Sequence, residues 1–183
     1  MVQAPVLKFI NQHIEAVGLC VRDGLAGPAL VLTYVGIDAF GMLGRPVRRP
    51  ANSRKDFIAW AERYMISPRG LPFSGLELYG ARCGVLHTLG AESKLSEEGR
   101  IRRIFYAHGD RDPGPVNAKL AWVAKTRPDL DAVMVKVTDI TDAFILGVAN
   151  FGRDVDSDPA LQAVVIERSA KLFGQFARFP GAA

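Results

Sequence analysis

The chain has 183 residues, of which 49% are hydrophobic and 23% are charged. This composition is that of a globular protein and excludes an intrinsically disordered one, and the length suits a single domain over residues 1–183. The formal net charge of +4 permits binding to a polyanion such as RNA but does not require it, because a solvated surface also explains it.

The first two predicted helices are separated by a glycine-containing break. Over residues 6–21, apolar residues recur at three- and four-residue steps, which is the spacing of one helical face. Asp23 and Gly24 end this helix, and Pro28, which is acceptable in a first turn, precedes a second helix over residues 29–43. The apolar face of the first helix comprises Ile10, Ile14, Val17 and Val21.

Asp38 is the single charged residue in the apolar segment of residues 24–44. Such a segment could be a membrane span, but its five glycines, Pro28 and the acid are all unfavourable for a lone span. We therefore expect a buried core helix and no association with a membrane. A carboxylate in that helix needs a partner, for which Arg82 or His87 is a candidate; another arginine or solvent is the alternative.

The third and fourth predicted helices follow a basic loop over residues 44–53. An amphipathic pattern indicates the third helix, which residues 67–70 should end. Ser74 and Glu77 match the capping-box pattern, so a fourth helix is expected over residues 75–89. The apolar residues of the third helix are Phe57, Ile58, Trp60, Ala61, Tyr64 and Met65.

The pattern changes after the charged turn of residues 93–99. Residues 101–106 and 132–137 are rich in β-branched and aromatic side chains, and we expect them to pair as a small antiparallel ribbon. A Gly/Pro/Asp loop over residues 109–115 and a short helix near residues 118–125 lie between them. The segment 101–137 is thus a β-containing insertion.

Two further helices end the predicted order of elements. Thr138 is the expected cap of one helix, and Asp158 with Pro159 is expected to open the last. The predicted fold class is therefore mainly α, a helical bundle with a small two-stranded β insertion.

Cysteine usage and the first residues of the chain predict its compartment. Cys20 and Cys83 show none of the paired spacings of a zinc site or a disulfide framework. The first residues lack the basic-then-apolar order of a signal peptide. We therefore expect a reduced, cytoplasmic protein.

The sequence contains none of the common cofactor-binding or metal-binding motifs. The sequence has no Gly-rich phosphate loop, no His-Glu-x-x-His, no Gly-x-Ser-x-Gly and no paired Cys-x-x-Cys. The three histidines, His13, His87 and His108, fall on different predicted elements, which makes a shared metal site unexpected. We therefore expect no cofactor and no metal.

Arg82 and His87 are the remaining candidates for chemistry, and they lie on the fourth predicted helix with four residues between them. Five positions on a helix correspond to about 140° of rotation and about 7.5 Å of rise, so the two side chains do not stack on one face. Two copies of the helix across a twofold axis could bring both pairs into one groove, which favours a homodimer. The alternative is a structural Arg82–His87 pair within the bundle.

This arrangement resembles the HEPN superfamily, whose signature is an arginine separated from a histidine by four to six residues on a late helix of a bundle. Arg82 and His87 match that signature with four residues between them. The resemblance covers residues 6–89 and, more weakly, the last two helices. The insertion over residues 101–137 has no counterpart in it.

In the members that cut RNA, the resemblance implies a dimeric, metal-independent endoribonuclease with the motif of both chains in the cleft. His87 would then transfer protons at the ribose 2′-hydroxyl or the leaving oxygen, and Arg82 would stabilise charge on the phosphate. Asp38 joins these two candidates because its carboxylate needs a partner, and not through the resemblance.

The residue after the motif arginine is commonly polar in active members, and here it is Cys83. This favours the alternative of a catalytically inactive HEPN-like dimer that serves as a scaffold or RNA-binding module. An antitoxin or other protein partner is also compatible with the resemblance.

Overall fold

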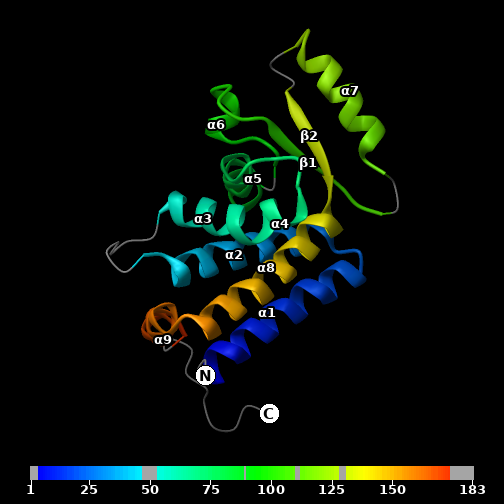
Figure 1. Ribbon diagram of the computed structural model, residues 1–183. Helices are drawn as coiled ribbons and strands as arrows, with labels where there is room; N and C mark the ends of the chain where they lie inside the picture. The colour runs from blue at the N-terminus through cyan, green and yellow to red at the C-terminus, as the bar shows by residue number, and fades with distance from the viewer. Residues whose placement is uncertain (1–3, 47–52, 89, 110–111, 128–130, 174–183) are drawn as a thin grey trace.

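The computed structural model of the chain (Figure 1) describes residues 4–46, 53–88, 90–109, 112–127 and 131–173. The fold is mainly helical with a small two-stranded sheet, as the sequence predicts. Most of the basic loop, Leu89, and the end of the last predicted helix beyond Phe173 lie outside the described residues. The long helices of the bundle are α1 (Ala4–Arg22), α2 (Ala26–Gly44), α5 (Gly75–Thr88), α8 (Val137–Ser157) and α9 (Pro159–Phe173).

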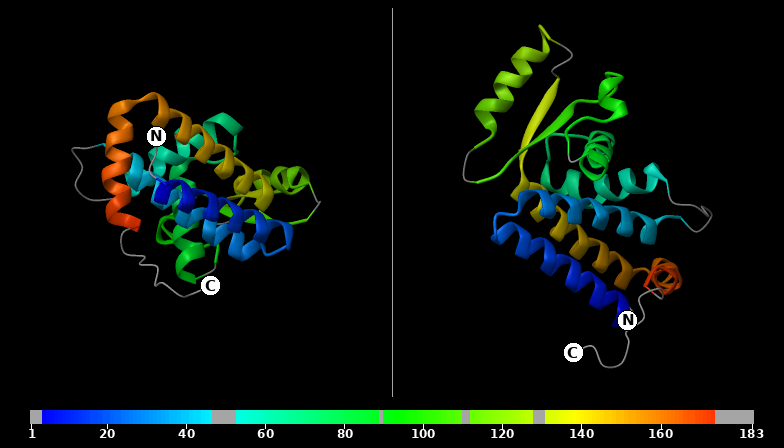
Figure 2. Two further views of the ribbon diagram at one scale, coloured as in Figure 1. Left: turned by 90° about the horizontal axis from the view of Figure 1, so that it is seen from below. Right: turned by 180° about the vertical axis from the view of Figure 1, so that it is seen from behind.

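Helix α2 is the central element, because it packs against α1, α8, α9, α5 and α3 (Arg54–Ala61). Its buried face includes Tyr34, Ile37 and Phe40. Helix α2 is thus a core helix, as the sequence predicts. By length and composition, α2 is also the one helix in the described part of the chain that could cross a membrane, and 50% of that stretch is buried. In the view from behind, α2 runs across the front of the bundle (Figure 2, right).

An aromatic cluster joins α2, α3 and α8. The ring of Phe40 lies 5.6 Å from that of Trp60 and 6.0 Å from that of Phe144, measured between centroids. Gly36 allows this close crossing, because a Cβ at that position would collide with the Phe144 ring and with His13 Nε2. Burial of these large rings provides much of the hydrophobic stabilisation of the bundle.

The third predicted helix is confirmed, and it is longer and less regular than the sequence indicates. Helix α3 continues through a π-helical turn, η1 (Glu62–Ile66), into the short α4 (Ser67–Arg69). Gly70 then takes a left-handed conformation with φ of 60° and ends the helix, as predicted. A short helix, α6 (Lys94–Glu97), forms within the predicted charged turn.

The predicted antiparallel ribbon is wrong, because the two strands are parallel. β1 (Arg103–Ala107) pairs with β2 (Ala132–Lys136), with Arg103 opposite Ala132 and Ala107 opposite Lys136. The connection between them contains α7 (Gly114–Ala124), and this crossover returns the chain to the end at which β1 began. Parallel pairing is the consequence, since an antiparallel pair is normally joined by a short hairpin.

The insertion is fastened to the bundle through the inner face of the sheet. Ile104 and Tyr106 of β1 face the bundle, and the Tyr106 hydroxyl is hydrogen-bonded to the Tyr34 hydroxyl of α2. Burial, together with the neighbouring Tyr106, raises the pKa of Tyr34 well above its ordinary value, so both hydroxyls stay neutral. β1 also packs against α5.

The last two helices begin differently from each other. Thr138 is not the cap of α8: the helix begins at Val137, directly after β2, with Lys136 in the cap position and no side-chain cap. The reason is that the strand passes straight into the helix without a turn. The Asp158 prediction is confirmed, because Asp158 Oδ1 accepts hydrogen bonds from the backbone N–H groups of Ala160 and Leu161 at 2.9 and 3.2 Å.

Candidate functional site

Helix α5 carries Arg82 and His87, and its start is firmly anchored. The Ser74 N–H donates to Glu77 Oε2 at 2.7 Å and the Glu77 N–H donates to Ser74 Oγ at 3.3 Å, which is the predicted capping box. Arg102 Nε donates to Glu77 Oε1 at 2.6 Å. Burial opposes ionisation of Glu77, but the bonds from Arg102 and Ser74 outweigh it and lower the pKa of that carboxyl.

Arg82 is the partner of Asp38, as the sequence analysis proposes. Arg82 Nε and Nη2 donate to the same oxygen, Asp38 Oδ2, at 2.9 and 2.8 Å. The two side chains are 23% and 27% exposed, so the pair lies at the edge of the α2–α5 contact and not in the deep core. Burial disfavours the charged guanidinium, yet its bonds and attraction to Asp38 outweigh that cost and raise the pKa of Arg82.

Tyr79 and Cys83 extend this pair along α5, and Tyr79 is not among the site residues that the sequence predicts. The Arg82 guanidinium carbon lies 5.9 Å from the centre of the Tyr79 ring, a cation–π distance. Cys83 lies four residues after Tyr79, on the same side of the helix. Burial, followed by Cys83, raises the pKa of the Tyr79 hydroxyl. The three- and four-residue spacings of these side chains were the available signal.

His87 stands apart from Arg82 in the same chain. Its side chain is exposed, and no hydrogen bond joins it to another residue that the structure describes. The predicted structural pair with Arg82 is absent from the described contacts of both residues, and Asp38 contacts Arg82 instead. His87 is therefore available to solvent.

The exposed side of α5 lies between these two residues. At about 100° per residue, the incompletely buried side chains cover about 140° of the helix, with Arg82 at one edge and His87 at the other. The incompletely buried residues between these two edges form an apolar stripe. The incompletely buried residues are Leu76, Tyr79, Arg82, Cys83, Leu86 and His87.

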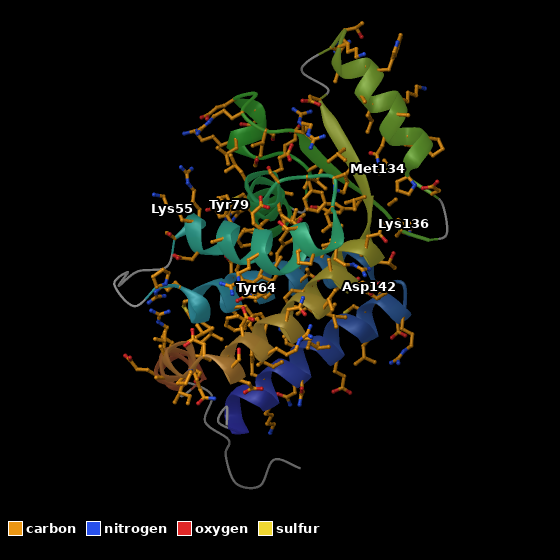
Figure 3. All side chains as sticks on the ribbon, viewed as in Figure 1. Lys55, Tyr64, Tyr79, Met134, Lys136 and Asp142 are labelled. Carbon is orange, nitrogen blue, oxygen red and sulfur yellow. The ribbon has the colours of Figure 1, made fainter. Side chains whose placement is uncertain are left out.

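Helix α2 adds a second uncovered stripe beside the first. Val31, Val35 and Met42 share one side of α2 with Asp38, and Val35 is 43% exposed. The Asp38–Arg82 pair joins the two stripes, which together are here called the α2/α5 face. Its residues are Val31, Val35, Asp38 and Met42 of α2 and Tyr79, Arg82, Cys83, Leu86 and His87 of α5 (Tyr79 is labelled in Figure 3).

The described residues offer no metal site, and a pocket of about 450 Å³ lies away from α5. Among the described residues, no three His, Cys, Asp or Glu side chains are grouped so as to hold a metal ion. His13 is a core residue, since its Nε2 donates to the Leu32 carbonyl at 2.7 Å. The pocket, which the sequence analysis did not foresee, lies between α2, α3, η1 and α8 and is lined by Trp60, Tyr64 and Asp154 among others. No residue of α5 lines it.

Comparisons with family models, with curated proteins and with solved structures find no match for this chain.

Proposed function

We propose that the chain is a metal-independent endoribonuclease of the HEPN type, acting as a homodimer with Arg82 and His87 of both copies in one cleft. The observation that supports this most is the form of the α2/α5 face. Arg82 and His87 stand at opposite edges of the exposed side of α5, with Tyr79, Cys83 and Leu86 between them. Two copies packed through this face would place the arginine of one near the histidine of the other.

The uncovered apolar surface supports the dimer. Helix α2 is apolar around most of its circumference, which is typical of a helix covered on all sides. In one chain, however, Val31, Val35 and Met42 are left incompletely covered. A second copy would bury them and would desolvate the Asp38–Arg82 pair further.

Each side chain has a definite chemical part in the proposal. His87 of one copy takes the proton from the ribose 2′-hydroxyl, whose oxygen attacks the phosphorus, and His87 of the other gives a proton to the leaving 5′-oxygen. The products are a 2′,3′-cyclic phosphate and a 5′-hydroxyl. Arg82 uses two of its five N–H groups on Asp38, which leaves three to contact the phosphate oxygens. Asp38 is thus a positioning residue.

The second candidate is a HEPN-like dimer that binds RNA or serves as a scaffold without cutting. Cys83 favours it, because the residue after the motif arginine is commonly polar in the members of the superfamily that cut RNA. The face and the dimer would be the same, and only the cleavage would be missing.

An RNA cleavage assay in EDTA separates the two candidates. Wild type should cut RNA and spare DNA, which lacks the 2′-hydroxyl. His87→Ala should lose roughly 10²–10⁴ in rate, and Arg82→Lys should also be poor because a point charge replaces the planar fork. His108→Ala is the matched control, since His108 is exposed on the loop after β1. Unchanged cleavage by His87→Ala would rule out the mechanism, and an inactive wild type would favour the scaffold.

The dimer has a separate test. Light scattering should show a dimer at micromolar concentration, and Val35→Glu should convert it to a monomer by placing a charge in the apolar face. Leu19→Glu is the control, because Leu19 is 41% exposed on α1, outside the face. A wild-type monomer would count against the proposed cleft.

A further inference from the structure

Helix α7 is held against β2 by hydrogen bonds between the Asn117 side chain and the β2 backbone, and most of its side chains are exposed to solvent. The Asn117 amide Nδ2 donates to the Met134 carbonyl at 2.7 Å, and the Met134 N–H donates to Asn117 Oδ1 at 2.5 Å (Met134 is labelled in Figure 3). No described residue of α7 is buried. The helix is therefore fixed against β2, with Asn117, Leu120, Val123 and Ala124 half-buried and its other side chains exposed.

Two aromatic side chains are exposed on this insertion. Trp122 of α7 is 66% exposed and Phe105 of β1 is 38% exposed. Phe105 lies in an apolar groove of about 220 Å³ between β1 and α7, which Arg103 and Lys119 also line. A tryptophan is highly buried on average, so a ring this open on an anchored helix needs a reason.

The charged residues of α7 and of the segment that follows it as far as Arg127 are all basic. Residues 114–127 contain Lys119, Lys125 and Arg127 and no acidic residue. Lys119 and Lys125 lie three positions before and three after Trp122, which makes them its neighbours on the helix surface. Both lysines are exposed, and neither forms an ion pair with a residue that the structure describes.

We propose that the insertion binds single-stranded RNA, with Trp122 stacked on a base and with Lys119 and Lys125 contacting the phosphates on either side. This combination of an open aromatic ring with exposed lysines beside it is how proteins hold single strands without reading their sequence. An acidic peptide would satisfy the lysines but would leave the Trp122 ring without a partner. The inference rests on the proposed function, because it supplies the substrate contact of the same enzyme.

The attachment of the insertion gives this contact a role in cleavage. β1 packs against α5, and the Tyr34–Tyr106 hydrogen bond joins it to α2. RNA held on α7 is thereby kept in a fixed relation to the helix that carries Arg82 and His87. Loss of the contact should raise the KM for RNA and leave kcat nearly unchanged.

Tryptophan fluorescence tests the stacking directly. The chain has two tryptophans, and Trp60 is only 4% exposed, so emission that a base quenches should come from Trp122. The binding experiment uses the His87→Ala protein in EDTA, which keeps the RNA intact, with a single-stranded oligoribonucleotide of about 12 nucleotides. Quenching should saturate with binding and should be absent in Trp122→Ala.

Measurements of RNA affinity test how much Trp122 and the two lysines each contribute to binding. Trp122→Ala should weaken RNA binding about 5- to 150-fold, which corresponds to the loss of one stacked base. Lys119→Gln and Lys125→Gln should each reduce the slope of log affinity against log salt by about 0.7. Leu19→Ala and Lys8→Gln on α1 are the matched controls and should change neither quantity. Circular dichroism checks that each variant is folded.

The outcomes separate this inference from the proposed function. Quenching and weakened binding in Trp122→Ala, with no cleavage by wild type, would uphold RNA binding by the insertion and reject the ribonuclease. Cleavage with an unchanged KM in Trp122→Ala would uphold the ribonuclease and overturn the inference. Equal quenching by poly-glutamate, or no RNA binding by the wild-type insertion, would also overturn it.

Discussion

Replacing Asp38 with alanine removes the oxygen that accepts two hydrogen bonds from Arg82, and a double-mutant cycle measures what that pair contributes. The cycle compares wild type, Asp38→Ala, Arg82→Ala and the double variant. Its interaction free energy isolates the pair from the other contacts of each residue. The measurement decides whether Asp38 holds Arg82 in place.

The geometry sets the expected size of this interaction. Hydrogen bonds to charged groups contribute roughly 1.5–3 kcal/mol, whereas exposed ion pairs contribute about 0.2–1 kcal/mol. Arg82 and Asp38 are 23% and 27% exposed and lie between these cases. Both bonds also end on one carboxylate oxygen, so the geometry is not the stronger two-oxygen fork. We expect an interaction free energy of about 1–2 kcal/mol.

The assay is equilibrium unfolding in urea, monitored by circular dichroism at two protein concentrations, because dimerisation would link stability to concentration. The pair Glu98–Arg100 is the control, since its side chains are 40% and 54% exposed and 3.4 Å apart. Its interaction should be about 0.5 kcal/mol or less. An interaction for Asp38–Arg82 no larger than the control would refute the view that Asp38 positions the guanidinium.

Two further predictions concern the bundle. Gly36→Ala should destabilise the protein by about 1–3 kcal/mol in urea unfolding, because the added Cβ would collide with the Phe144 ring. Gly18→Ala is the control and should stabilise the protein by about 0.5–1 kcal/mol, because open space surrounds that position. Equal changes in stability for the two variants would contradict the close packing of Gly36. Burial lowers the pKa of His13, although its bond to Leu32 opposes this, so the native state binds fewer protons than the unfolded state. Stability should therefore fall as the pH drops below about 6.5, and thermal unfolding of His13→Leu should show a flatter pH dependence.

Several elements follow from local sequence alone. The capping box of α5 joins Ser74 to Glu77 within one turn, and Asp158 caps the helix that it directly precedes. The end of the third helix at Gly70 is equally local, since the left-handed conformation there suits glycine. Such features depend on residues a few positions apart, so the sequence contains the whole interaction.

Two predictions were corrected, one on the direction of the strands and one on the residue that caps α8. The β-prone composition of both strands was correct, but composition does not say whether the strands run in the same direction. The helix between them, α7, decides the relative direction of the strands, because a strand–helix–strand order favours a parallel pair. Thr138 was predicted to cap α8 because threonine is a common cap residue. It does not occupy the cap position, because β2 passes into α8 without a break.

The sequence by itself determined that Asp38 needs a partner and that Arg82 and His87 point in different directions along one helix. Only the tertiary structure decided that Arg82 is the partner, because this pairing joins residues 44 positions apart and depends on how α2 crosses α5. The same crossing left Val35 and Met42 uncovered beside the pair. Helical periodicity fixes which side chains share a face of one helix, but which faces are covered depends on how the helices pack.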